Sequence, residues 1–134
     1  MVLVDTSIWI RFLRNQAPYL AELKKLLMLR EVAGHELIYG ELLIGNHGGR
    51  TTLLNDYSGM AQVQTITHRE VVALVRARRL SSRGAGWIDI HLLAAALVSG
   101  VELWTADASL FALASELGIA YVAPGRTGSA ARSK

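Results

Sequence analysis

Short apolar segments alternate with longer segments of helical periodicity along almost the whole chain. The apolar segments are residues 2–6, 32–33, 62–66, 101–105 and 119–122, which we interpret as strands. We interpret the segments in which apolar residues recur at helical spacing as helices. One begins near Ile8, a second begins after Pro18, and the others are residues 36–44, 51–57, 68–80, 88–98 and 110–117. Strands that are separated by helices imply a parallel sheet covered by helices. The expected fold class is therefore α/β, a three-layer fold with a short parallel sheet flanked by helices.

The length and composition of the chain predict one domain. A chain of 134 residues with 51% hydrophobic content is sufficient for one compact core. Residues 124–134 are rich in Gly, Ser, Ala and Arg, so we expect a flexible C-terminal tail there. The predicted domain therefore spans residues 1–123.

Two absences narrow the possible functions. The chain has no cysteine, which excludes disulfides, thiolate nucleophiles and cysteine-based zinc sites. It begins with Met-Val-Leu-Val-Asp and lacks the features of a secretory signal. The most apolar run, residues 92–98, is much shorter than the roughly 20 residues that span a bilayer. We therefore expect a cytoplasmic protein that does not enter a membrane.

Four acidic residues stand at the edges of apolar segments. Asp5 lies at the carboxyl end of the first predicted strand, and Asp107 follows the predicted strand at 101–105. Glu41 lies in a predicted helix, and Asp89 lies in the first turn of another. Such carboxylates are costly to desolvate unless a cation or hydrogen-bond donors compensate them. If the four converge, their oxygens suit Mg²⁺ or Mn²⁺. Each alone also has a simpler interpretation, as a helix cap, a solvated residue, a dipole partner or a turn former.

The hydroxyl residues after the first strand have two possible roles. Thr6 or Ser7 is the expected N-cap of the first helix. No Ser-His-Asp arrangement is identifiable, so we expect capping or hydrogen bonding to neighbouring groups rather than nucleophilic attack.

The rest of the chain is basic. The formal net charge is +3, although the four candidate acids are all negative. The densest basic cluster consists of Arg76, Arg78, Arg79 and Arg83. Such a cluster attracts polyanions through counterion release, and its simpler interpretation is a solvated helix end. We interpret it as a candidate RNA-binding surface.

The histidines and tryptophans are weaker candidates. The four histidines lack the spacing of a zinc site. His91 lies two residues beyond Asp89, and on a helix that offset points it away from the acid. Trp9, Trp87 and Trp104 are candidates for stacking on nucleobases, but we expect at least two of them to pack in the core.

Four segments resemble, in order and spacing, the successive motifs of PIN-domain ribonucleases. They are Val-Leu-Val-Asp-Thr-Ser-Ile-Trp-Ile, Gly-Glu-Leu-Leu-Ile-Gly, Trp-Ile-Asp-Ile-His-Leu-Leu-Ala and Leu-Trp-Thr-Ala-Asp-Ala-Ser-Leu-Phe. The likeness extends to about Val122 and is greatest to the VapC toxins of prokaryotic toxin–antitoxin pairs. The resemblance implies a PIN-like fold. It places the acidic quartet of the family on Asp5, Glu41, Asp89 and Asp107, with Thr105 as the polar member of a Thr-x-Asp motif.

The same resemblance implies an activity and partners. It implies a Mg²⁺- or Mn²⁺-dependent endoribonuclease that cleaves RNA with a metal-activated water and is inhibited by a VapB-like antitoxin. Asp5, Asp89 and Asp107 would bind the metal directly or through water, and Glu41 would bind it or orient water. Homodimers are also implied, and we expect Trp9, together with the first helices, to line the groove for the antitoxin.

Two other functions fit part of the sequence. A haloacid-dehalogenase-like phosphatase also has an aspartate after its first strand, but it usually needs a second aspartate where this chain has Ser7. A catalytically silent PIN-fold module that binds RNA or protein is the remaining alternative.

Overall fold

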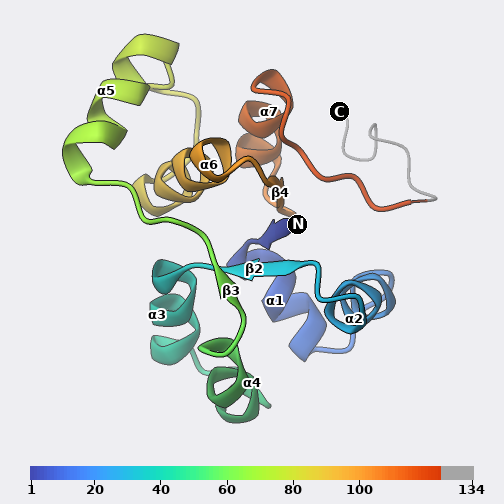
Figure 1. Cartoon of the computed structure of the whole chain (residues 1–134). Coiled ribbons are helices and arrows are strands. Elements are labelled where there is room, and N and C mark those ends of the chain that lie inside the picture. The colour runs from blue at the N-terminus through green and yellow to red at the C-terminus, as the bar shows by residue number, and fades with distance from the viewer. Residues whose placement is uncertain (125–134) are drawn as a thin grey trace.

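A computed structural model describes residues 1–124 and contains a four-stranded parallel sheet with helices on both sides (Figure 1). The strands are β1 (Val2–Val4), β2 (Val32–Gly34), β3 (Ala61–Gln62) and β4 (Glu102–Trp104). The helices are α1 (Thr6–Leu13), α2 (Tyr19–Met28), α3 (Glu36–Ile44), α4 (Arg50–Tyr57), α5 (His68–Arg78), α6 (Trp87–Ser99) and α7 (Ala108–Glu116). The predicted α/β class is confirmed. The predicted tail at 124–134 lies, apart from Pro124, outside the described residues.

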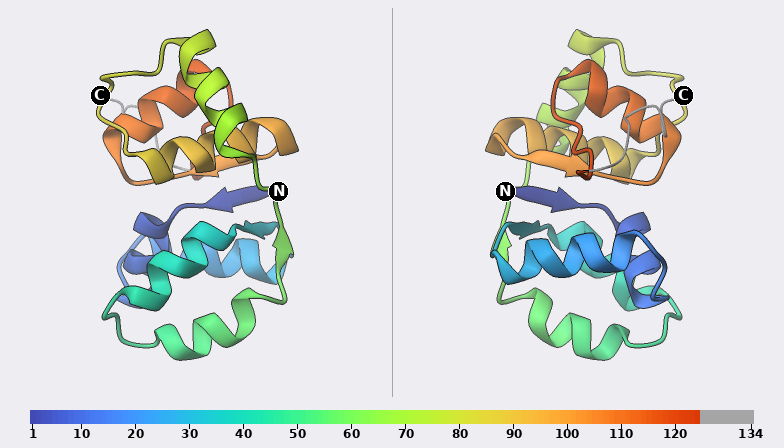
Figure 2. Two further views of the ribbon diagram at one scale, coloured as in Figure 1. Left: turned by 90° about the vertical axis from the view of Figure 1, so that its left-hand side faces the viewer. Right: turned by 90° about the vertical axis from the view of Figure 1, so that its right-hand side faces the viewer.

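The order of the strands places a switch point beside β1. The order of strands in the sheet is β3-β2-β1-β4. The chain therefore moves from β1 outward to β3 and then returns, so that β4 pairs with the other side of β1. Helices α1–α4 lie on one side of β1 and α5–α7 on the other (Figure 2). In open α/β sheets, ligands bind at the carboxyl ends of the strands where the order reverses. In this protein, the carboxyl ends of β1 and β4 are the expected ligand-binding position.

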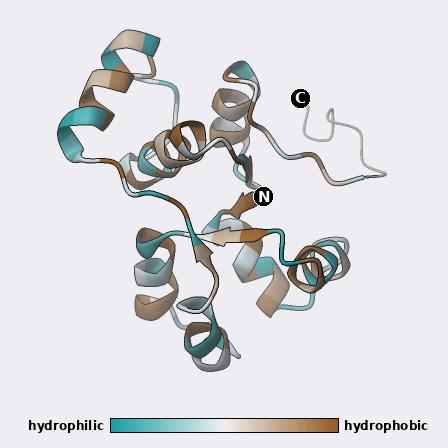
Figure 3. Ribbon diagram, in the orientation of Figure 1, coloured by the Kyte–Doolittle hydropathy of each residue, from teal (hydrophilic) through white to brown (hydrophobic). Residues whose placement is uncertain are grey.

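The core is centred on the sheet and on α6. Leu3 and Val4 are fully buried, and five consecutive residues of α6, Leu92 to Ala96, are buried as well. A helix that is apolar all round is typical of the interior of a domain. Figure 3 shows the contrast with α5, whose two ends are hydrophilic. Within residues 1–124, no helix combines the length and apolar character needed to cross a membrane.

The predicted strand at 62–66 is wrong in most of its length. Only Ala61 and Gln62 form β3, and the backbone N–H of Val63 adds one hydrogen bond to the carbonyl of Gly34 at 2.9 Å. The segment then leaves the sheet, yet Val63 and Ile66 remain buried. The alternation of apolar and polar residues therefore arises from a connecting segment that packs on the core. Burial produces such an alternation whether or not the segment pairs with a strand.

Two further predictions at element ends are corrected. Residues 119–122 form a single parallel bridge, between Ala120 and Leu103, rather than a strand. The N-cap of α1 is Asp5, not Thr6 or Ser7, because these two are the first residues inside the helix. The side chain of Asp5 makes no capping hydrogen bond, which leaves its carboxylate available for other partners.

Gly34 allows an aromatic side chain to cross the end of β2. The ring of Tyr57 lies so close that a Cβ on Gly34 would stand 2.9 Å from it, and 2.6 Å from Nε2 of Gln62. The Tyr57 hydroxyl accepts a hydrogen bond from the backbone N–H of His35 at 2.9 Å. This contact anchors α4 beneath the carboxyl edge of the sheet.

We predict that Gly34→Ala lowers the free energy of unfolding by about 1–3 kcal/mol, because the new methyl group overpacks this contact. Gly40→Ala is the matched control, since a Cβ on Gly40 of α3 meets no atom of residues 1–124 within 4 Å. That control should stabilise the protein by up to about 1 kcal/mol through helix propensity. Urea denaturation measures both values, and equal effects of the two substitutions would contradict the packing argument.

Candidate active site

Asp5 and Thr105 meet at the carboxyl edge of the sheet. Strands β1 and β4 are parallel, and their last residues, Val4 and Trp104, are paired. The residues that follow these two, Asp5 and Thr105, therefore lie side by side. Thr105 Oγ1 donates a hydrogen bond to Oδ2 of Asp5 at 2.8 Å, and both residues are buried. The register of the sheet thus brings together two residues that are 100 positions apart in the sequence.

Ser7 is a second hydroxyl donor to the same oxygen. Its Oγ donates to Oδ2 of Asp5 at 2.7 Å and accepts from the backbone N–H of Ala106 at 3.0 Å. Ser7 therefore links the first turn of α1 to the segment after β4. Both hydroxyls hold Oδ2, while Oδ1 of Asp5 has no hydrogen-bond partner within residues 1–124. Fixing one oxygen in this way orients the other.

Glu41 is tied to α1 by the neighbouring hydroxyl. It comes from the second half of α3 and is half-buried, and Thr6 Oγ1 donates a short hydrogen bond to its Oε1. Thr6, Ser7 and Asp5 are consecutive, so one short segment contacts two of the four acids. Capping of α1 or hydrogen bonding to neighbouring groups was expected of these hydroxyls, and the second alternative is confirmed, with carboxylates as the partners. The Asp-Thr-Ser run directly after a strand was the available signal.

Asp89 lies in the first turn of α6 and is coupled to the other three acids. Burial raises its pKa most, and the charge of Asp5 raises the pKa next. A hydrogen bond from the N–H of Gly86 at 3.3 Å opposes the shift, whereas the charges of Asp107 and Glu41 raise the pKa further. Since Coulomb interactions of this kind fall with distance, the four carboxylates belong to one electrostatic cluster.

Asp107 combines two tasks at the start of α7. Its Oδ1 accepts from the backbone N–H of Leu110 at 2.8 Å, so Asp107 is the N-cap of that helix. Its own N–H donates to Oγ1 of Thr105 at 3.0 Å. Thr105 therefore bridges Asp5 and the backbone of Asp107, and the side chain of Asp107 stays exposed. The simpler interpretation of Asp107 was a turn former, and the structure shows it instead as a helix cap that also belongs to the cluster.

The connection between α5 and α6 is held against α7. Gly84 adopts a left-handed conformation, and a Cβ there would stand 2.6 Å from Oγ of Ser109. One residue earlier, Arg83 forms an exposed ion pair with Glu116. The segment that leads into Asp89 therefore contacts the helix that begins at Asp107.

The donor set fits a hard divalent cation. All four side chains offer carboxylate oxygens, which Mg²⁺ and Mn²⁺ prefer. Within residues 1–124, no three His, Asp or Glu side chains stand close enough together to hold one ion directly. Mg²⁺ usually keeps several waters and binds through one or two carboxylates, so this looser spacing is compatible with it. Burial raises the pKa of Asp89 most, and the negative charges of Asp5, Asp107 and Glu41, which such an ion would balance, raise the pKa further.

The arginine cluster lies away from the acids. Arg76 and Arg78 are in the last turn of α5, and Arg79 follows in a left-handed conformation with φ 55°. All three are exposed, in the hydrophilic end of α5 that is visible in Figure 3. Arg83 differs from them because its guanidinium is paired with Glu116.

His35 and His91 differ in burial and in their contacts. His35 is buried, its Nδ1 accepts from the N–H of Leu37 as the N-cap of α3, and burial lowers its pKa. Its Nε2 has no hydrogen-bond partner among the described residues. His91 contacts Trp87 edge-on, with ring centroids 5.1 Å apart.

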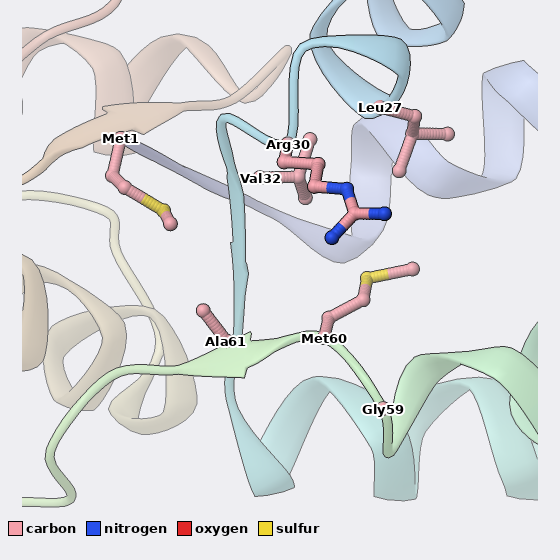
Figure 4. Close-up of a pocket in the computed structure, with 7 residues that line it drawn as sticks. All are labelled: Met1, Leu27, Arg30, Val32, Gly59, Met60 and Ala61. Atoms are coloured by element: carbon pink, nitrogen blue, oxygen red, sulfur yellow. The ribbon is translucent and has the colours of Figure 1, made fainter.

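A separate pocket lies at the opposite edge of the sheet (Figure 4). It has a volume of about 470 Å³ and includes the residues that begin β2 and β3. Its lining consists of Met1, Leu27, Arg30, Val32, Gly59, Met60 and Ala61. None of the predicted site residues lines it, so the pocket is distinct from the acidic cluster.

Comparison with known proteins identifies the family. The family model of the PIN domain matches residues 2–117. Ribonuclease VapC32 of Mycobacterium tuberculosis, in strains CDC 1551 / Oshkosh and ATCC 25618 / H37Rv, is 42% identical over 121 residues, which cover 90% of this chain and 95% of the relative. The chain therefore belongs to the PIN domain family and, within it, to the VapC proteins.

A solved structure supports the fold assignment. The crystal structure of PAE2754 from Pyrobaculum aerophilum matches with a TM-score of 0.55 and 21% sequence identity. The match covers 87% of this chain and 88% of the other. At this identity the likeness concerns the fold alone.

We predict that Asp89→Asn stabilises the metal-free protein at neutral pH. The folded-state pKa of Asp89 is raised, so its ionisation destabilises the fold above that pKa, and the effect disappears below the unfolded-state pKa. Because Asp89 is half-exposed, the gain should be less than about 1 kcal/mol. Thermal melting at neutral and acidic pH measures it, and Asp56→Asn, on the exposed face of α4, is the control. A gain that persists at acidic pH would contradict the electrostatic explanation.

Proposed function

We propose that this protein is a metal-dependent endoribonuclease that acts in the cytoplasm as the toxin of a VapB–VapC pair. The observation that carries the proposal is the carboxylate of Asp5, buried at the switch point of the sheet in a cluster where Asp89 is electrostatically coupled to Asp5, Glu41 and Asp107. The 42% identity to a protein named as a ribonuclease supports RNA as the substrate. Burying a carboxylate and placing it near other carboxylates destabilises the fold, and a catalytically silent module would gain nothing from this arrangement.

Asp5, Asp89 and Asp107 would hold Mg²⁺ or Mn²⁺, directly or through water, and Glu41 would bind the ion or orient water beside it. A bound ion of this kind lowers the pKa of a water and neutralises charge on the phosphate. The chain supplies the orientation. Ser7 and Thr105 fix Oδ2 of Asp5, so that Oδ1 would be the oxygen available to the ion.

The carboxylates also determine which groups act on the water. Glu41 accepts from Thr6 through Oε1, so its second oxygen is the acceptor available for a water proton. Ser7, the serine beside Asp5, is not free to act as a nucleophile, because its hydroxyl donates to Asp5 and accepts from the N–H of Ala106. The reaction class that fits is hydrolysis of a phosphodiester by water.

We predict that Asp5→Asn abolishes RNA cleavage, by at least about a hundred-fold, since it removes a metal-binding charge while conserving size. Asp56→Asn, which changes an exposed acid on α4, should retain full activity. Gel assays of a labelled RNA with Mg²⁺, with Mn²⁺ and with EDTA give the rates. Cleavage by Asp5→Asn at the wild-type rate, or cleavage unaffected by EDTA, would rule out the proposed site.

The arginine cluster is the proposed RNA-binding surface. A metal at the acids balances one phosphate, and the flanking phosphates need other cations. Arg76, Arg78 and Arg79 are exposed in one cluster at the end of α5. Arg83 contributes less in this proposal, because Glu116 already neutralises it.

We predict that changing Arg78 and Arg79 together to Ala raises KM and flattens the salt dependence of RNA binding. The slope of log K against log salt should change by about 0.7 for each phosphate of a single strand that the variant no longer neutralises. Arg30→Ala is the matched control, since Arg30 is exposed at the opposite edge of the sheet. The same slope in the double variant and the control would assign the cluster to a solvated helix end.

The proposed partners are a VapB-like antitoxin and a second copy of the chain. Trp9 does not take part as the sequence predicted, because it is fully buried against Phe12 and Tyr57. Exposed apolar side chains near the ends of α2 and α3 are better candidates for such contacts; they are Met28, Leu29, Leu43 and Ile44. Light scattering of the purified chain at several concentrations tests the dimer.

A further inference from the structure

The three tryptophans differ sharply in exposure. Trp9 and Trp104 are 0% and 6% exposed, as expected for core residues, whereas Trp87 is 43% exposed. Trp87 is the first residue of α6, at the helix end that carries Asp89. Indole is the largest aromatic group, and its exposed surface is well suited to contact a flat ligand.

Two imidazole rings flank the exposed indole. The ring of His68, from the start of α5, is 5.3 Å from that of Trp87, and the ring of His91 is 5.1 Å away. His91 lies one helical turn after Trp87, on the same face of α6.

The aromatic group lies in the same helical turn as one of the four acids. Trp87 and Asp89 are two residues apart, about 3 Å along the helix axis. Residues at this offset point in different directions from a helix, so the indole and the carboxylate lie on different faces of the first turn of α6. An RNA strand of several nucleotides can contact both sides of one helical turn.

We propose that Trp87, supported by His68 and His91, is a stacking site for a nucleobase of a single-stranded RNA that is bound at the acidic cluster. This inference rests on the proposed ribonuclease function. Every nucleobase has a face that stacks on an aromatic ring, so such a site selects unpaired strands rather than a particular base. Paired bases in a duplex are already stacked and cannot reach it.

The test is a titration of the full chain with a short single-stranded RNA in EDTA, which prevents metal-dependent cleavage. Base stacking should quench the fluorescence of Trp87, and the quenching should disappear in Trp87→Phe, which retains both buried tryptophans. Trp87→Ala should raise the dissociation constant about 5- to 150-fold, whereas Trp87→Phe should stay within a few-fold of wild type. Val98→Ala, an exposed change at the far end of α6, is the matched control.

A second RNA that carries abasic riboses separates stacking from other roles. Trp87→Ala should bind this strand as wild type does, and in cleavage assays it should raise KM more than it lowers kcat. An equal loss with both strands, or no loss with the natural strand, would overturn the stacking site. Unchanged RNA binding with weakened antitoxin binding would overturn it too, and would assign this surface to the protein partner.

The two proposals fail in different ways. Cleavage by wild type together with unchanged KM in Trp87→Ala would overturn the stacking site alone. Absence of both RNA binding and metal-dependent cleavage in wild type would overturn the ribonuclease function and the stacking site together.

Discussion

The pairing of β1 with β4 is the constraint on which the rest of the site depends. It places Asp5 beside Thr105, and their hydrogen bond of 2.8 Å stabilises a carboxylate that is only 4% exposed. Without hydroxyl donors, a buried carboxylate would be strongly unfavourable. Ser7 supplies the second donor and joins α1 to the same point. The sheet register, the first helix and the segment after β4 thus converge on one oxygen atom, and the other acids are arranged around it.

The sequence was informative where burial and chemistry coincide. Asp5 and Asp107 could be identified because each follows an apolar strand, and α3 was predicted with its observed bounds because its apolar periodicity ends at Gly45. The limits of β3 could not be predicted, since Val63 and Ile66 are buried whether or not they pair in the sheet. Partners of side chains were also beyond reach, because the bond between Ser7 and Asp5 competes with ordinary helix capping. Metal binding itself stays a prediction.

Charges are divided between two regions of the molecule. The acids lie together at the edge of the sheet, whereas the exposed arginines 76, 78 and 79 lie at the far end of α5. A polyanion would be repelled by the first region without a metal and attracted by the second. In the proposed function, this division would separate the attraction of RNA from its cleavage, so that each could be altered without the other. The aromatic group at Trp87 lies at the acidic end of α6 and offers a contact that does not depend on charge.

The contact of Gly84 with Ser109 limits insertions in the connection between α5 and α6. The connection between α5 and α6 is exposed, and exposed loops ordinarily accept insertions. Here its backbone lies against the first turn of α7, close enough that a Cβ on Gly84 would stand 2.6 Å from Oγ of Ser109. Five residues after Gly84 comes Asp89, and two residues before Ser109 stands Asp107. The loop therefore acts as a spacer between two acids, and its length is constrained by the geometry of the site rather than by the stability of the fold.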